Sequence, residues 1–125
     1  QRLVRKVCVK CKETYEPSPE AIKQLGISEK DRAAHAKKIL FTRGRGCQAC
    51  GKKGYSGRAV LLEALSISPA IKAMILKNAQ EYELKRMGRK EGMKTLRENG
   101  IAKVLQGVTT PEEVMRVTVR DEDSL

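Results

Sequence analysis

The four cysteines of this 125-residue chain form two Cys-x-x-Cys pairs. The first pair is Cys8 and Cys11, and the second is Cys47 and Cys50. Two intervening residues let the chain turn tightly enough for both sulfurs of a pair to contact one metal ion, and a second pair completes a tetrahedron of thiolates around Zn²⁺. Because four thiolates fill every ligand position, the spacing predicts a structural zinc site with no position open for catalysis.

Three other interpretations of the paired cysteines stay open from the residues alone. Two disulfides would require an oxidising compartment, and nothing in the chain reads as a secretory signal peptide. A redox dithiol usually occurs once, at the start of a helix after a buried strand, and neither pair has that setting. Four ordinary buried cysteines would have no physical reason to be paired twice at the same spacing.

Positive charge is concentrated in the part of the chain that contains the cysteines. The formal net charge is +11, and residues 1–58 carry fifteen Lys or Arg against five Asp or Glu. Cations suit the surroundings of a tetrathiolate zinc centre, whose local charge is about −2. The same excess is typical of surfaces that bind nucleic acid or anionic lipid head groups. Only four aromatic residues are present to stack on bases, which weakens the case for nucleic-acid binding. A basic zinc ribbon that binds nucleic acid is therefore kept only as the alternative function.

A hydroxyl residue followed by proline predicts the start of three helices. The hydroxyl caps a free backbone N–H, and proline suits the first helical position. The predicted helices cover residues 19–25, 69–77 and 111–117. Gly26 and Asn78 are expected to end the first two, and Glu113 is expected to complete a capping box with Thr110. A further, polar helix is predicted over 29–40.

Apolar residues next to the cysteine pairs predict two short strands. One contains Leu3, Val4 and Val7, and the other covers 58–66. After residue 70 the apolar positions recur three and four apart, which is the period of amphipathic helices that pack in a small bundle. The expected fold class is therefore α+β and mainly helical.

These elements predict two structural units and a tail. Residues 1–66 would form a small tetracysteine zinc lobe with short strands, 67–120 a C-terminal helical bundle, and 121–125 a disordered acidic tail. Zinc would supply part of the folding free energy of the first unit, whose apolar core looks small. No apolar run approaches the roughly 20 residues that cross a bilayer, so no transmembrane segment is expected.

The sequence offers few candidate catalytic groups. The chain contains no phosphate-binding loop of the form G-x-x-x-x-G-K-[ST]. His35 is the only histidine and is interpreted as a solvated side chain on the polar helix. Glu63 has no companion group for general acid–base chemistry and is expected to pair with an arginine such as Arg58. No catalytic or cofactor-binding residue is therefore predicted.

Several motifs along the chain resemble one known family. They are Gln1-Arg2-Leu3-Val4-Arg5 before the first pair, Gly46-Cys47-Gln-Ala-Cys50 and Gly54-Tyr55-Ser-Gly57-Arg58 around the second, and Thr109-Thr110-Pro-Glu112-Glu113-Val114 near the end. In this order they are similar to the C-terminal part of the secretion ATPases, the hexameric motors of type II secretion and type IV pilus assembly. The resemblance covers nearly the whole chain, and this combination is more specific than the cysteine pattern alone.

The resemblance implies that the chain is a fragment whose nucleotide site lies in a RecA-like core before Gln1. The parent protein would be an ATPase that uses ATP and Mg²⁺, whereas the fragment would have no enzyme activity. The family's structural zinc ligands correspond to Cys8, Cys11, Cys47 and Cys50. Arg58 would brace the zinc lobe or contact a neighbour. The implied partners are neighbouring subunits of a homohexamer and an inner-membrane platform protein, and nucleic acid is not expected.

The predicted role is that of a zinc-stabilised element for assembly and coupling in such a motor. The implied location is the cytoplasm, at the periphery of the inner membrane through the partners. The step from Arg5 to Cys8 is too short for a flexible linker, so a lobe attached there would move with the preceding core. Retraction motors of pili typically lack the tetracysteine lobe, so the resemblance favours an assembly or secretion motor.

Overall fold

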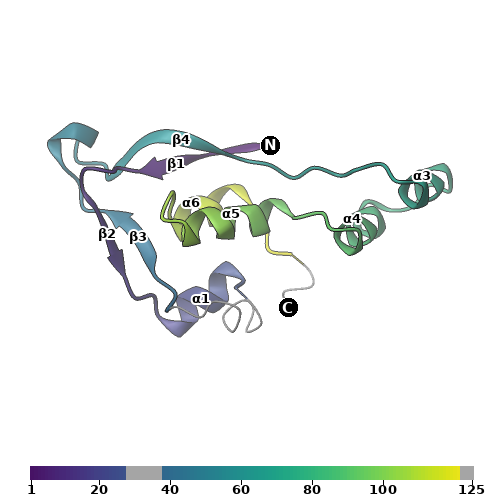
Figure 1. The fold of residues 1–125 in the computed structure, drawn as a ribbon, viewed down its shortest axis with the longest axis horizontal. Helices are drawn as coiled ribbons and strands as arrows, with labels where there is room; N and C mark the ends of the chain where they lie inside the picture. The colour runs from purple at the N-terminus through teal and green to yellow at the C-terminus, as the bar shows by residue number, and fades with distance from the viewer. Residues whose placement is uncertain (28–37, 122–125) are drawn as a thin grey trace.

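Two antiparallel β-ribbons frame the helices in the computed structural model, which describes residues 1–27 and 38–121 (Figure 1). The first ribbon pairs β1 (Arg2–Val7) with β4 (Tyr55–Leu61), and the second pairs β2 (Lys12–Tyr15) with β3 (Phe41–Gly44). Because the first residue of β1, Arg2, lies opposite Leu61, β4 has no partner strand beyond that point. The predicted strand over 58–66 is therefore wrong for its last residues, and the strand begins earlier, at Tyr55.

Five α-helices and one 3-10 turn complete the described part of the chain. They are α1 (Pro19–Leu25), η1 (Gln48–Cys50), α3 (Pro69–Leu76), α4 (Glu81–Lys90), α5 (Leu96–Leu105) and α6 (Pro111–Val117). At the three predicted starts, the hydroxyls of Ser18, Ser68 and Thr110 accept hydrogen bonds from backbone N–H groups three residues later. Gly26 ends α1 in the left-handed conformation, with φ of 102°. The mixed α+β class predicted from the sequence is confirmed.

The main buried cluster joins elements from both ends of the chain. It contains Ile22, Leu25, Ile27, Phe41, Val104 and Val114. Figure 1 shows α5 and α6 lying below the β1–β4 ribbon, while the β2–β3 ribbon runs down beside them toward α1, which lies on their other side. The predicted boundary near residue 66 therefore passes through a shared core, and the division into 1–66 and 67–120 remains a prediction.

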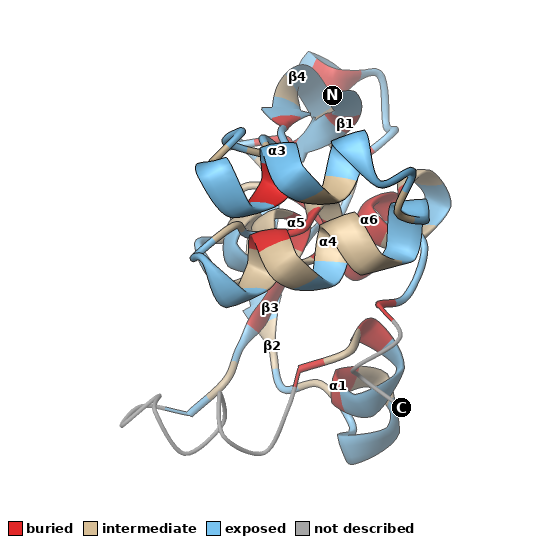
Figure 2. Cartoon of the chain, turned by 90° about the vertical axis from the view of Figure 1, so that its right-hand side faces the viewer, coloured by how far each residue is buried: buried red, intermediate tan, exposed pale blue. Residues whose placement is uncertain are grey.

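The pair of helices α3 and α4 lies at the end of the molecule away from the bend between the two ribbons (Figure 1). Residues 62–68 lead to this pair without regular secondary structure. In α3 only Ile71 is buried, whereas Ile75 and Leu76 are 45% and 76% exposed. Figure 2 shows that this helix pair presents mostly exposed and partly exposed residues to the viewer.

Several charged residues lie elsewhere than the sequence predicted. Residues 38–40 are not helical, and the rest of the predicted helix, residues 29–37 with His35, lies outside the described residues. Asp121, predicted to begin the disordered tail, is only 4% exposed. Its carboxylate accepts a hydrogen bond of 2.6 Å from the Thr95 hydroxyl and lies 3.3 Å from Lys85 Nζ. Among the described helices, none combines the length and hydrophobicity that a membrane span requires.

Candidate metal centre

The structure gathers all four predicted ligand residues at the bend between the two ribbons. Cys8 follows β1 and Cys11 precedes β2, while Cys47 and Cys50 lie in the connection from β3 to β4. Their four Sγ atoms lie within 4.8 Å of one another. Cys8 and Cys50 are buried, and the other two are partly exposed. In the parts of the chain that the structure describes, this is the one group of three or more Cys, His, Asp or Glu residues arranged to hold a metal ion.

Three of the six distances between the sulfurs match those of a tetrahedral metal site, and all six are within 4.8 Å. Cys8 and Cys47 are separated by 3.8 Å, Cys11 and Cys50 by 3.8 Å, and Cys47 and Cys50 by 3.7 Å. Four thiolates placed about 2.3 Å from a zinc ion at tetrahedral angles would be about 3.8 Å apart. A disulfide would bring two sulfurs to about 2.05 Å, and the four cysteines are free in the structure. The donor set and its spacing therefore suit a thiophilic metal ion.

Backbone amides supply direct donors to the sulfurs. The N–H groups of Cys47 and Gly54 donate to Cys50 Sγ at 3.2 and 3.3 Å, and the N–H of Gly46 donates to Cys11 Sγ at 3.3 Å. The hydrogen bond from Cys47, reinforced by the one from Gly54, outweighs burial and lowers the pKa of Cys50 to about 6. Burial raises the pKa of Cys11 to about 11, despite the hydrogen bond from Gly46. Bound metal would stabilise the thiolate form at both positions.

A close crossing of two backbone segments positions these amides. A Cβ atom on Gly44 would lie 2.1 Å from the carbonyl oxygen of Gly54, and a Cβ on Gly54 would lie 2.7 Å from that of Gly44. Gly54 also has φ of 83°, and its carbonyl accepts a hydrogen bond of 3.0 Å from the N–H of Cys8. Only glycine allows this approach at both positions. The two glycines therefore close the loop that carries Cys47 and Cys50, and the Gly54 carbonyl links this loop to Cys8.

Comparison with known proteins assigns the chain to a family. The family model described as "Type II/IV secretion system protein" matches residues 1–116. The chain belongs to this family. It is 43% identical over 119 residues to the "Type IV pilus assembly ATPase PilB" of Thermus thermophilus, 38% identical over 118 residues to the protein of that name from Pseudomonas aeruginosa, and 37% identical over 118 residues to the "Type II secretion system ATPase E" of Vibrio cholerae.

These alignments cover nearly all of this chain but a small part of each relative. They include 95%, 94% and 94% of the chain, against 13%, 20% and 22% of the three relatives. The family resemblance that the sequence motifs indicated is thereby confirmed. The region matched to the type II/IV secretion family contains the tetracysteine cluster together with most of the helices that follow it.

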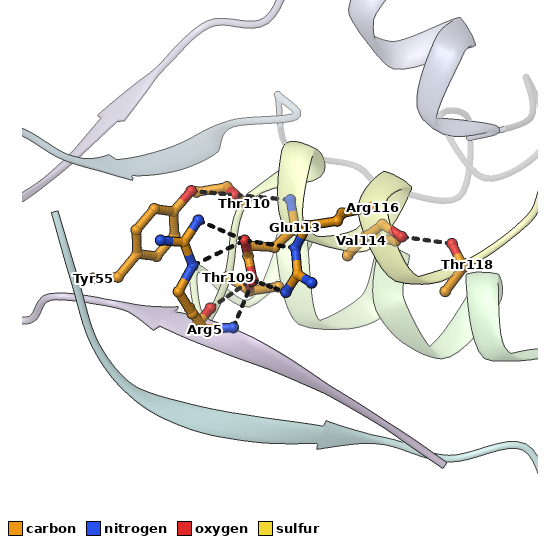
Figure 3. A network of polar contacts seen from close by, with 8 residues as sticks. All are labelled: Arg5, Tyr55, Thr109, Thr110, Glu113, Val114, Arg116 and Thr118. Carbon is orange, nitrogen blue, oxygen red and sulfur yellow. Dashed lines mark hydrogen bonds and ion pairs between the residues drawn. The ribbon is translucent and has the colours of Figure 1, made fainter. Parts of the chain in front are cut away.

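A second polar cluster in this family member joins β1 to α6 (Figure 3). Glu113 is only 1% exposed. Its carboxylate accepts hydrogen bonds from the backbone N–H of Arg5 at 2.8 Å and from the Arg5 guanidinium at 2.8 and 3.0 Å. Arg116 donates two more, at 2.9 and 3.3 Å. The Arg5 guanidinium also lies 4.1 Å from the ring centre of Tyr55, whose hydroxyl is 2.8 Å from that of Thr110. We call this cluster the Arg5–Glu113 brace.

The Arg5–Glu113 brace corrects one sequence prediction. Thr110 accepts a hydrogen bond from the N–H of Glu113 as expected, but the Glu113 side chain bonds the two arginines, so the capping box is not completed. Burial by itself would raise the pKa of Glu113, but the hydrogen bonds from Arg116 and Arg5 outweigh it and lower the pKa to about 2. The sequence marked the helix start and gave no signal for a partner 108 positions away.

Glu63 and Arg58 do not form the ion pair that the sequence suggested. Glu63 is exposed, accepts a hydrogen bond of 2.8 Å from the N–H of Leu96, and lies 3.8 Å from Lys85 Nζ. It lies beyond the end of β4, in the segment 62–68 that leads to α3. Arg58 is exposed on β4, directly opposite Arg5 in the ribbon.

Proposed function

We propose that this chain is the C-terminal, zinc-stabilised part of a hexameric ATPase that powers type IV pilus assembly or type II protein secretion. Family membership over residues 1–116 and the names of the relatives support this proposal. The relatives are far longer than the chain, and the chain has no phosphate-binding loop. The nucleotide site, with ATP and Mg²⁺, therefore belongs to the rest of the parent, and this part acts without enzyme activity of its own.

The observation that carries the proposal is the gathering of four sulfurs at tetrahedral spacing inside a region matched to the secretion family. Cys8, Cys11, Cys47 and Cys50 would hold one structural Zn²⁺. When bound, the ion supplies a cross-link between the β1–β4 and β2–β3 ribbons, and four thiolates leave it no open position for substrate. The exposed lysines at 10, 52 and 53 reduce the net negative charge of such a centre.

The attachment of this lobe suits a coupling role. β1 ends at Val7 and the first cysteine follows directly, so no flexible linker separates the strand from the metal centre. The Arg5–Glu113 brace ties the same strand to α6. A displacement of β1 by the motor core would therefore carry the metal centre and the last helices with it. Neighbouring subunits and an inner-membrane platform protein are the proposed recipients, on the cytoplasmic side of the membrane.

Metal content of the purified chain tests the zinc proposal. Native mass spectrometry should find one zinc per chain, and denaturation should release four reactive thiols. Cys47→Ser should lose the metal and destabilise the ribbons, whereas Val9→Ser, at a 71% exposed position within the first pair, should retain both metal and fold. Full stability of Cys47→Ser, or of the wild-type chain after complete chelation, would rule out a structural metal.

Cross-linking in the full-length hexamer tests the coupling proposal separately. Cysteine pairs placed between the motor core and α6 should cross-link with equal efficiency in the ATP-bound and ADP-bound states, because the two parts move together. Pairs placed between neighbouring subunits should change their efficiency between the states. A lobe that swings independently of its own core would contradict the coupling role and leave the zinc proposal intact.

The exposed cations around the cysteines favour one second candidate, a basic zinc ribbon that binds nucleic acid. Lys6, Lys10, Lys12, Lys52 and Lys53 are all exposed near the bend between the ribbons. Such a surface would bind DNA or RNA with an affinity that falls steeply with salt, by about 10³-fold or more between 50 and 200 mM for six or more phosphate contacts. Fluorescence anisotropy with short duplex DNA and single-stranded RNA decides between the two functions, because the motor proposal expects no binding near 150 mM salt.

A further inference from the structure

A pocket of about 780 Å³ lies between α3, α4 and the segment that leads to α5. Three of the four methionines in the chain, Met74, Met87 and Met93, line it, and each is partly buried. The fourth, Met115 in α6, packs against the main core instead. Methionine is flexible and polarisable, so a group of methionines at a surface can adapt to apolar side chains of different shapes. The gathering of these residues points to a binding surface.

Cationic side chains surround these methionines. The pocket is lined by five Lys or Arg side chains and two carboxylates. Both carboxylates have local partners: Glu83 accepts a hydrogen bond from the N–H of Gln80, and Glu98 lies 3.5 Å from Arg89. Among the lining residues, Lys77, Lys90 and Lys94 are exposed. The pocket therefore combines partly buried methionines with exposed cationic side chains.

We propose that this pocket is a docking site for a segment of another protein that carries acidic side chains around one or two apolar side chains. Charge complementarity selects the acidic residues, and the methionine side chains select the apolar ones. The site lies at the opposite end of the molecule from the cysteines and depends on neither metal nor nucleotide (Figure 1).

Methyl NMR of the whole chain tests this site directly. Chain labelled with ¹³C at the methionine methyl groups would be titrated with a synthetic peptide of about twelve residues, with two leucines four positions apart among Asp and Glu. The signals of Met74, Met87 and Met93 should shift together, and the signal of Met115 should stay in place. One control peptide replaces the leucines with serine, and another replaces the acidic residues with lysine; both should bind at least tenfold more weakly.

Charge-reversed variants locate the site independently of the NMR signals. The triple change Lys77→Glu, Lys90→Glu and Lys94→Glu should weaken binding of the acidic peptide at least tenfold. The matched triple change Arg2→Glu, Lys23→Glu and Lys72→Glu reverses the same charge at exposed positions outside the pocket and away from the cysteines, and it should change affinity less than twofold. Circular dichroism checks that both variants fold.

Three outcomes would overturn the proposal. The peptide could fail to bind at millimolar concentration, or both triple variants could weaken it equally. The serine peptide could also bind as tightly as the leucine peptide, which would show that the surface attracts any polyanion without using its methionines. Each result is independent of metal content and of subunit cross-linking, so it leaves the proposed motor function untouched.

Discussion

Replacing Glu113 with glutamine tests whether the Arg5–Glu113 brace stabilises the fold. The change keeps the shape of the side chain but removes its charge. The carboxylate accepts five hydrogen bonds from Arg5 and Arg116. Glutamine keeps one acceptor oxygen and turns an NH₂ group toward the remaining donors. The variant therefore leaves a buried backbone N–H or a guanidinium without its partner.

The expected loss of stability follows from the pKa of Glu113. That pKa is about 2 in the fold, against an ordinary value of 4.5. At about 1.4 kcal/mol per pKa unit, the ionised carboxylate contributes about 3 kcal/mol to the free energy of unfolding at pH 7. Removing one partner of a buried ion pair typically costs about 3–5 kcal/mol. The lower end applies here, because Arg5 and Arg116 are about half exposed and water can solvate them.

Urea denaturation followed by circular dichroism measures this difference, with wild type and variant compared at each pH. The folded-state pKa is depressed, so the stabilisation is fully present above pH 4.5 and is lost as pH falls toward 2. The advantage of wild type over Glu113→Gln should fall from about 3 kcal/mol at pH 7 to about 1.5 kcal/mol at pH 3. Protonation of the cysteines at low pH affects both proteins and cancels in the difference.

Glu112→Gln is the matched control, because Glu112 is exposed in the same first turn of α6. It should cost at most about 0.5 kcal/mol through the helix dipole alone. The reasoning would be refuted by a loss below about 1 kcal/mol for Glu113→Gln at pH 7, or by a loss that does not change between pH 7 and pH 3.

Three further predictions concern the ribbons, a helix start and the metal. Gly44→Ala should destabilise the fold by about 3 kcal/mol or more in urea denaturation, because its Cβ would lie 2.1 Å from the Gly54 carbonyl oxygen. Gly92→Ala is the control: its Cβ would meet no other atom, and the φ of 103° alone should cost about 1 kcal/mol. Ser68→Ala removes the cap of α3 and should cost about 1 kcal/mol by thermal denaturation. Chelation should lower the melting temperature of the wild-type chain and leave that of Cys47→Ser unchanged.

Features that depend on one turn of the chain could be predicted from the sequence. The hydroxyl caps at Ser18 and Ser68 and the glycine at position 26 act within three or four residues, and the structure has each of them as expected. The Cys-x-x-Cys spacing is local in the same sense, because two residues determine how closely two sulfurs can approach one ion. The meeting of the two pairs depends on the tertiary structure. It could still be predicted, because one pair supplies only two of the four ligands that a tetrahedral zinc site requires.

Long-range polar contacts left no local signal. Glu113 has the spacing that suits a capping box, yet its carboxylate bonds Arg5, because a charged guanidinium is a stronger donor than a neutral amide. Asp121 follows the last helix and precedes more acidic residues, so it resembled a solvated tail. Its burial depends on Thr95 and Lys85, which the sequence does not relate to it. The sequence shows that such residues are polar, but their partners are set by the tertiary structure and lie far away along the chain.

The contacts of Glu113 belong to a larger set that covers the edge of β1 facing away from β4. Val7 donates its N–H to the carbonyl of Val108 at 2.9 Å, the Arg5 carbonyl accepts from the Thr109 hydroxyl at 2.7 Å, and the Arg5 N–H donates to Glu113. Residues around the start of α6 thus occupy an edge that would otherwise expose unpaired backbone groups. Since β1 is held by β4 on one side and by this segment on the other, it cannot shift without moving both, and a metal ion held at Cys8 would extend the same constraint to the second ribbon.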